Sequence, residues 1–410
     1  MNLLFISTIF PSSHKPTRGI YSLYLLTALR DMGWTIEVIN PFPFCPGVDN
    51  FIRKKVFPPA HETLNELPVT HAPFFYTPGY FVEKHYWFYR KAVAKKMKSG
   101  IARLKERSPN PELPIHVMLG FVYPDAFAMA PICQRLELDY SVMIYGSDFL
   151  LRRFQPKFSP LVMQCLQEAP KIFCPGYVLK EEMIKEGIDG LKIHSFYNGI
   201  DTNVFHTPIS KAASSTSSKF KPHSNTILFV GNLLEVKKVD RLLKAFTILV
   251  REKTSNSRQT EFNDLHLNII GDGALAKVLK RLVQELHIEQ QVHFAGRELA
   301  SQIAARMQNA KCLCLCSYSE GMPNVVLEAL ACGCPVVATD VGEVPRLIEE
   351  GINGYTVATR EQSEEQIIES LVQALRKALS HEWDRQQIAK KMNRYTWPAA
   401  ARIVSSALLK

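Results

Sequence analysis

The feature that most constrains the fold is a strand, a tight turn and a helix that follow one another without a gap. Residues 312–317 are apolar at almost every position, as in a buried strand. Glu320-Gly321 then turns the chain, and Pro323 suits a first helical position, where a backbone N–H is not needed. The helix stops before Pro335, which begins another apolar strand. This order of elements predicts an α/β sheet.

Two carboxylates accompany the start of this helix. Glu320 lies just ahead of the helix N-terminus, where free N–H groups and the helix dipole favour a phosphate. Glu328 follows eight residues later, roughly two turns along the helix. One acid can hold the hydroxyls of a sugar, the other those of a ribose, with the diphosphate between them. The plainer interpretation is a surface Glu at a turn and an exposed helical Glu, but the strand, turn and prolines around them favour a nucleotide-sugar site.

In this context Glu320 and Glu328 resemble the E-x7-E motif of the retaining glycosyltransferases of family 4, also called glycosyltransferase group 1. The resemblance implies the GT-B fold, an α/β architecture in which two Rossmann-like, doubly wound domains face each other across a cleft. In that family the counterpart of Glu320 binds the donor sugar and that of Glu328 binds the ribose. The resemblance also places the intervening residues at the sugar and phosphate: Gly321, Met322, Pro323, Asn324 and Val325.

The length of 410 residues exceeds one ordinary core, so we expect two domains of roughly 200 residues each. No apolar run reaches the ~18 residues that span a bilayer. Leu3–Phe10 lacks a basic flank and a cleavage site, so it predicts a first strand and not a signal peptide. The predicted division is an acceptor-binding domain, a Ser/Lys-rich linker, a nucleotide-sugar-binding domain and a C-terminal helix that, by the resemblance, packs back on the first domain: 1–205, 206–224, 225–395 and 396–410.

The cysteines and the net charge restrict the compartment and the kinds of binding partner that we expect. The nine cysteines form no C-x-x-C pair, so we expect small buried side chains, no metal site, and a reduced, cytoplasmic compartment. The net charge of +10 favours nucleotide diphosphates, phospholipid headgroups or nucleic acid. Because no segment resembles a nucleic-acid-binding module, we expect no nucleic-acid partner.

The first half begins as a doubly wound sheet does, with a strand, a loop, a helix and a strand over residues 3–39. The loop lacks G-x-G-x-x-G, so a dinucleotide fingerprint is not indicated. Gly19 resembles the glycine with which the family brings backbone close to donor phosphate or acceptor. A plain helix-entry glycine is an equal alternative.

Two later loops resemble the family's Y-P-D-G and G-S-D segments: Tyr123-Pro-Asp125 and Gly146-Ser-Asp148. Both follow strands, so both are expected to face the cleft. The second departs from the family at Tyr145, where many members carry His or Arg. Asp148 is the expected acceptor-side carboxylate of catalysis, with a helix N-cap as the alternative.

The stretch 81–107 is aromatic and then strongly basic. A basic helix with aromatic residues at one end can lie on an anionic membrane surface, and the family often uses lipid-linked acceptors. The alternative is a core-packing helix with a solvated basic face. We therefore expect a cytoplasmic protein that, in the first interpretation, lies peripherally at the inner face of the membrane.

The second half repeats the α/β pattern, and its loops resemble the donor-binding loops of the family. Lys237 is the expected cation that neutralises the departing diphosphate in catalysis. Asn232 replaces an Arg of many relatives and Lys238 the usual Gly, so Lys238 is an alternative diphosphate contact. Two further loops resemble the base-recognition edge: Gly271, Asp272, Gly273 and Arg297.

The expected activity is the transfer of a hexosyl unit from a nucleotide sugar to a glycan or lipid-linked acceptor in cell-surface polysaccharide or glycolipid synthesis. No D-x-D pair occurs near a strand end, so we expect neither a metal nor a cofactor. The alternatives are a GT-B epimerase, which turns over nucleotide sugar without an acceptor, and a non-catalytic GT-B scaffold. A glycan phosphorylase would need a phosphate or pyridoxal signature, which we do not find.

Overall fold

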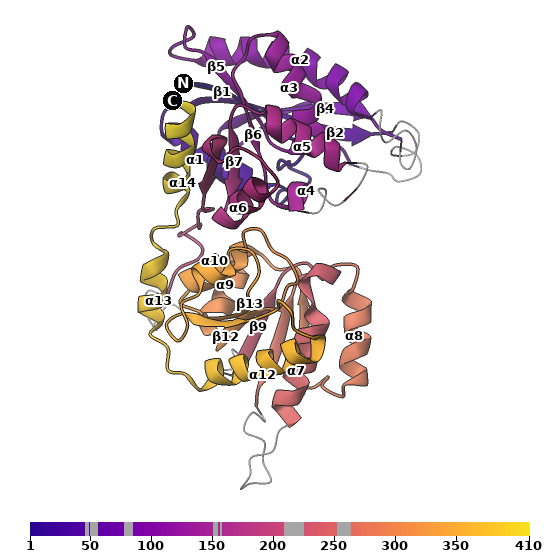
Figure 1. Ribbon diagram of the computed structural model, residues 1–410, viewed down its shortest axis with the longest axis vertical. Coiled ribbons are helices and arrows are strands. Elements are labelled where there is room, and N and C mark those ends of the chain that lie inside the picture. The colour runs from indigo at the N-terminus through magenta and orange to yellow at the C-terminus, as the bar shows by residue number, and fades with distance from the viewer. Residues whose placement is uncertain are drawn as a thin grey trace. The chain divides into compact units, whose positions relative to one another are not determined.

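The structure is a computed structural model that describes residues 1–45, 49, 56–77, 85–150, 155, 158–208, 225–251 and 264–410, with the backbone alone at 147 and 148. The described chain divides into two compact units (Figure 1). The first contains Met1–Gly199 and Trp397–Lys410, and the second contains Ile200–Thr396. Most of the predicted linker, 209–224, lies outside the described residues.

The first unit holds an eight-stranded sheet in the order β3-β4-β2-β1-β5-β6-β7-β8. Neighbouring strands are parallel except β3 and β4, which form an antiparallel hairpin. The strands are β1 (Asn2–Ile6), β2 (Thr35–Phe44), β3 (His61–Leu64), β4 (Leu67–Phe75), β5 (Ile115–Leu119), β6 (Tyr140–Met143), β7 (Ile172–Pro175) and β8 (Ile193–Phe196). The helices are α1 (Ile20–Asp31), α2 (His85–Arg107), α3 (Phe127–Arg135), α4 (Ser147–Leu150), α5 (Ser159–Glu168), α6 (Tyr177–Lys185) and α14 (Trp397–Leu408).

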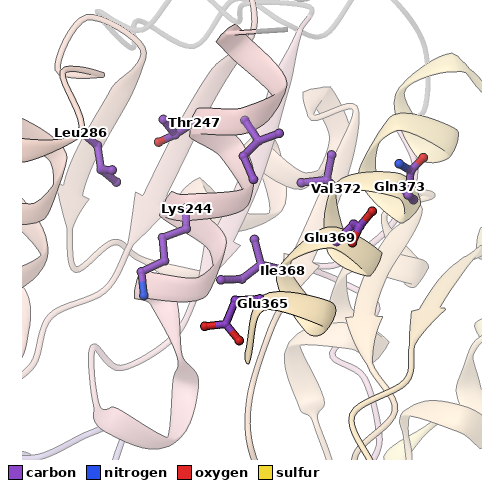
Figure 2. A pocket seen from close by; sticks show the side chains of 9 residues that line it. Lys244, Thr247, Leu286, Glu365, Ile368, Glu369, Val372 and Gln373 are labelled. Atoms are coloured by element: carbon purple, nitrogen blue, oxygen red, sulfur yellow. The ribbon is translucent and has the colours of Figure 1, made fainter. Parts of the chain in front are cut away.

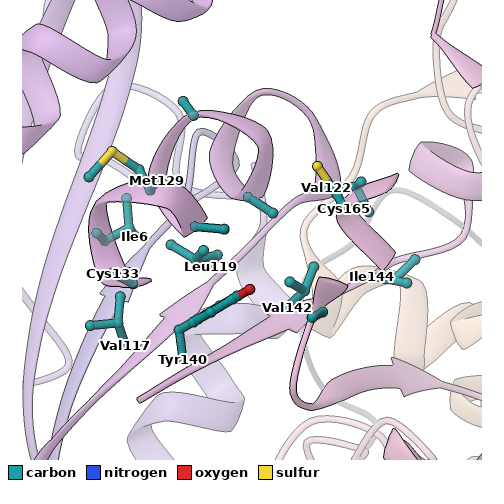
Figure 3. Packing of buried hydrophobic residues seen from close by; sticks show 14 of the residues in the cluster. Ile6, Val117, Leu119, Val122, Met129, Cys133, Tyr140, Val142, Ile144 and Cys165 are labelled. Atoms are coloured by element: carbon teal, nitrogen blue, oxygen red, sulfur yellow. The ribbon is translucent and has the colours of Figure 1, made fainter. Parts of the chain in front are cut away.

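Both faces of this sheet are covered, which explains why its strands read as continuous apolar runs. On β1, Leu4 and Ile6 join the core beneath α2, α3, α5 and α6, part of which Figure 3 shows. Leu3 and Phe5 point into the opposite core with α1 and α14. The C-terminal helix α14 therefore completes the first unit, and Trp397 at its start stacks on Tyr21 of α1.

The second unit holds a six-stranded parallel sheet in the order β11-β10-β9-β12-β13-β14. Its strands are β9 (Thr226–Val230), β10 (His266–Ile270), β11 (Val292–Gly296), β12 (Cys312–Leu315), β13 (Val336–Thr339) and β14 (Gly354–Val357). Its helices are α7 (Val239–Arg251), α8 (Ala276–Glu285), α9 (Ala300–Asn309), α10 (Asn324–Ala331), α11 (Val344–Leu347), α12 (Glu364–Ser380) and α13 (Arg385–Met392). The predicted α/β class with two parallel sheets is confirmed.

Two local expectations need correction. Pro323 is not the first helical residue but the position before it, with non-helical backbone at φ −79° and ψ 83°. The sequence Gly342-Glu343-Val344-Pro345 predicts the start of a helix that ends at Gly351, but the structure forms a single helical turn, α11, because the chain leaves helical geometry at Ile348. The buried cysteines expected on β12, Cys312 and Cys314, are confirmed.

Candidate functional site

Backbone contacts bring the loops at the carboxyl ends of β9, β10 and β11 together. Gly231 N–H donates to Ile270 O at 3.0 Å, and Gly271 N–H donates to Gly296 O at 2.7 Å. Gly271 has φ +134°, and a Cβ there would overlap the carbonyl oxygen of Gly231. Any side chain at this position would separate the first two loops, so glycine is required for their close approach.

Lys237 and Glu320 meet in the same domain although 83 residues separate them. Lys237 Nζ donates to Glu320 Oε1 at 2.5 Å, and both side chains are largely buried. The hydroxyl of Ser317 donates to the same carboxylate oxygen at 2.6 Å. The structure thus brings together two of the three predicted catalytic residues and adds Ser317, which sequence reasoning left without a role.

The loop that carries Lys237 is fastened to the end of β12. Tyr318 N–H donates to Val236 O at 2.8 Å. The thiol of Cys316 donates to the carbonyl oxygens of Lys237 and Lys238, at 3.4 and 3.1 Å. Lys237 is therefore held through its own backbone, independently of its charge.

A close backbone contact positions Glu320 from the other side. Gly342 has φ +54°, and a Cβ there would overlap the carbonyl oxygens of Glu320 and Gly321. Glu343 N–H donates to Gly321 O at 3.2 Å. The turn after β13 thus packs directly on the Glu320-Gly321 turn. Gly342 can be seen in the sequence, but its contact with Glu320 is a tertiary contact that the sequence alone does not reveal.

The side chain of Glu328 differs from that of Glu320 in having no hydrogen bond or ion pair among the described residues. It is half-buried on α10, between largely buried neighbours. Burial raises the pKa of Glu328 to about 7. A half-buried carboxylate without a partner is costly to ionise, and it is free to accept hydrogen bonds from a ligand.

The remaining predicted donor residues are spread along the loop ends. Asn232, Asp272 and Arg297 are exposed. Met322 and Pro323 are buried, whereas Gly321, Asn324 and Val325 are half-buried. Asp272 Oδ1 accepts the N–H of Gly273 at 2.8 Å. The ammonium of Lys238 pairs with Glu235 at 2.5 Å, so it already has a partner in its own turn. The backbone of Lys238 has a φ of +46°.

In the first domain, Gly19 precedes α1 with φ +71°, and a Cβ there would overlap the carbonyl oxygen of Ile9. The contact makes glycine necessary at this position. Asp125 is not at an open edge, as the loop position suggested, but fully buried. Its carboxylate accepts the N–H of Thr8 at 3.0 Å and the hydroxyl of Tyr89 at 2.8 Å. The side chain of Asp148 lies outside the described residues.

A cavity of about 560 Å³ lies between α7 and α12 and contains none of the predicted site residues (Figure 2). Its lining mixes charged and apolar side chains: Lys244, Thr247, Ile248, Leu286, Glu365, Ile368, Glu369, Val372 and Gln373. Within the described ranges, no three His, Cys, Asp or Glu side chains gather as a metal site. No helix in that part of the chain has the length and apolarity to span a bilayer.

Residues 210–395 match the family described as "Glycosyl transferases group 1". A similar curated protein is the putative teichuronic acid biosynthesis glycosyltransferase TuaC of Bacillus subtilis (strain 168). It is 28% identical over 85% of this chain and 83% of its own length.

Two solved structures show the same fold at low identity. Sucrose-phosphate synthase from Thermosynechococcus elongatus matches with a TM-score of 0.74 at 15% identity, over 100% of this chain and 98% of its own. Anabaena Alr3699/HepE in complex with UDP matches with a TM-score of 0.66 at 16% identity, over 100% of both chains.

Proposed function

Because the chain is a glycosyltransferase of group 1 with the GT-B fold, we propose that it transfers a hexosyl unit from a nucleotide-diphosphate sugar with retention of configuration. The acceptor is a glycan or a lipid-linked sugar of a cell-surface polysaccharide or glycolipid. One observation carries the proposal. The Glu320 carboxylate accepts hydrogen bonds from the Lys237 ammonium and the Ser317 hydroxyl. On the helix that follows, the side chain of Glu328 has no partner among the described residues.

Each group has a task in this reaction. Glu328 accepts hydrogen bonds from the ribose, and Glu320 accepts them from the sugar hydroxyls. Lys237 turns from Glu320 toward the diphosphate, whose negative charge grows as it departs. The bond from the anomeric carbon to phosphate breaks as the bond to the acceptor oxygen forms on the same face. The departing phosphate takes the acceptor proton, so neither an enzyme nucleophile nor a metal is required.

The test is turnover with radiolabelled UDP-glucose, UDP-galactose and UDP-N-acetylglucosamine, with a total membrane lipid extract or soluble oligosaccharides as acceptors. The choice of UDP follows the nucleotide bound in Anabaena Alr3699/HepE. We expect transfer from one donor, an unchanged anomeric configuration by NMR, and full activity in a chelator. Glu320→Ala should abolish transfer while the protein still folds, whereas Glu289→Ala, an exposed control, should keep full transfer activity. Full turnover in Glu320→Ala would reject the proposal.

We also propose that α2 holds the protein on an anionic membrane surface. One side of α2 packs in the core through Tyr89, Val93 and Met97. The opposite side is an exposed stripe of one aromatic residue and four cations at helical spacing: Trp87, Lys91, Lys95, Lys98 and Lys105. Trp87 is 53% exposed at one end of the stripe. An exposed indole beside lysines suits the headgroup region of a bilayer. Residues 81–84 of the predicted segment lie outside the described ones.

Not all cations of α2 are available for lipid. Arg103 and Arg107 both pair with the buried carboxylate of Glu37, at 2.6 and 2.5 Å. The structure therefore supports both interpretations of the helix, since these two arginines face its own domain while the lysine stripe faces outward.

Co-sedimentation with vesicles separates the two interpretations. We expect binding to phosphatidylglycerol-containing vesicles and not to pure phosphatidylcholine. Replacing Lys91, Lys95 and Lys98 by Gln should weaken binding about a hundredfold, at about 1 kcal/mol for each lysine near the surface. The matched control replaces three exposed cations of α8: Lys277, Lys280 and Arg281. An equal loss of vesicle binding in both triple variants would show that only net charge matters, and it would reject the proposal that α2 is the membrane-binding surface.

A further inference from the structure

A polar cluster in the first domain joins the loop after β1 to the β3–β4 hairpin. Glu62 on β3 accepts the backbone N–H of Ser13 with both carboxylate oxygens, at 3.3 and 3.1 Å. The same carboxylate accepts a hydrogen bond of 2.6 Å from Nε2 of His71 on β4. The side chain of His71 is 1% exposed and that of Glu62 is 10% exposed, so the pair is shielded from water.

The ring of His71 is also held from its other side. Its Nδ1 lies 3.1 Å from Oδ1 of Asn40, whose Nδ2 donates to the carbonyl oxygen of Ser7 at 2.7 Å. Because that carbonyl can only accept, the amide must present its oxygen to the ring. Both ring nitrogens of His71 therefore face acceptor oxygens, one of Asn40 and one of Glu62. Burial lowers the pKa of His71, and the hydrogen bond and charge of Glu62 oppose that effect.

The loop between Thr8 and Gly19 is thus fastened at two points. Asp125 holds its beginning through the N–H of Thr8, and Glu62 holds its middle through Ser13. A hydrogen bond to a carboxylate is about twice as strong as a neutral one, so it can resist competition from water. The held segment exposes a polar, cationic set of residues: Ser13, His14, Lys15, Pro16, Thr17 and Arg18.

We propose that Glu62, fixed in place by His71, is a positioning residue that holds this loop in the conformation that binds the acceptor. The inference rests on the proposed glycosyl transfer, in which the first domain receives the acceptor. It concerns neither the donor nor the bond that breaks, so it predicts an effect on acceptor binding alone.

The clamp itself is tested without any substrate, by hydrogen exchange of the Ser13 amide. Glu62→Ala removes the carboxylate that accepts the Ser13 N–H. His71→Phe keeps an aromatic ring at position 71 but removes the hydrogen bond that holds the Glu62 carboxylate. We expect exchange at Ser13 to accelerate about tenfold or more in Glu62→Ala and less in His71→Phe. The matched control is Glu66→Gln, on the exposed turn of the same hairpin, where Glu66 pairs with Arg30. Unchanged exchange in Glu62→Ala overturns the proposal.

The positioning role is tested by steady-state kinetics with the lipid-extract assay. In Glu62→Ala we expect the extract concentration at half-maximal rate to rise about tenfold, in line with the loss of a charge-assisted hydrogen bond. The maximal rate, the KM for the donor and the slow hydrolysis of donor by water should stay near those of Glu66→Gln. Glu62→Gln, which keeps an oxygen for Ser13, should recover part of the acceptor affinity.

The outcomes separate this inference from the proposed function. Faster exchange with an unchanged acceptor KM would leave a structural clamp and overturn the positioning role. A fall in donor hydrolysis would also overturn it, because it would show general damage. A wild-type protein that transfers no sugar at all would reject the proposed function, whereas the exchange at Ser13 would still decide the clamp.

Discussion

Replacing Glu328 by Gln should make the protein more stable at alkaline pH and impair its use of a nucleotide. Glutamine has nearly the shape of a protonated carboxyl, so the comparison isolates the cost of ionising Glu328. The folded-state pKa of Glu328 is about 7, raised from an unfolded value of 4.5. A raised folded pKa gives stability that is fully present below the unfolded pKa and is lost as pH rises through the folded one.

The magnitude follows from the size of this shift. At 1.36 kcal/mol for each pKa unit, ionisation of Glu328 destabilises the native state by about 3 kcal/mol at pH 8 and by about 1 kcal/mol at pH 5. For a unit near 200 residues, 1 kcal/mol shifts the melting temperature by about 2–4 °C. Glu328→Gln should therefore raise the melting temperature of the second domain by about 6–12 °C at pH 8 and much less at pH 5.

The assay is calorimetric unfolding of wild type and Glu328→Gln at both pH values, with Glu369→Gln on the exposed side of α12 as the matched control. In parallel, UDP affinity of the wild type should rise between pH 6 and pH 8, because the ribose hydroxyls need the carboxylate as an acceptor. In Glu328→Gln this pH dependence should disappear. An equal gain in stability at both pH values, or none at pH 8, would refute the account of an unpaired, desolvated carboxylate.

Three further predictions follow from the same structure. Lys237→Gln should lower kcat about 10²–10³-fold, as loss of a group that stabilises developing charge does, and retained turnover would exclude Lys237 from the departure of the diphosphate. Gly342→Ala should lower both kcat and the melting temperature, measured by turnover and thermal unfolding, because its Cβ would overlap backbone atoms of the Glu320-Gly321 turn at a φ of +54°. Burial and Lys171 lower the pKa of His116 to about 4. The wild type should therefore lose about 3 kcal/mol of stability as pH falls from 6.5 to 4. His116→Gln should lack that loss in thermal unfolding, and equal acid sensitivity of both proteins would contradict the lowered pKa.

The fold class could be predicted because both sheets are parallel, apart from the β3–β4 hairpin, and carry helices on both faces, which produces short apolar strands between helical patterns. The strands within residues 41–80 could not be predicted, because prolines within a segment argue against a central strand. The structure gives the reason. β2 pairs with β1 only as far as Ile39, so Pro41 and Pro43 lie where β2 has β4 as its single neighbour.

The candidate site shows the same limit. Glu320 and Glu328 were recognisable because they lie on one contiguous segment with a diagnostic spacing. The pairing of Lys237 with Glu320 and the support from Gly342 depend on how separate loops meet, which spacing alone does not encode. Asp125 was misplaced for a related reason: its position after a strand predicted an open edge, whereas Thr8 and Tyr89 enclose it.

The most direct test of the central claim is a crystal structure of the protein with UDP. The account predicts the ribose hydroxyls within hydrogen-bonding distance of the Glu328 carboxylate and the diphosphate beside Lys237, with the α10 N-terminus facing the phosphates. A nucleotide bound elsewhere, with Glu328 and Lys237 out of its reach, would contradict it.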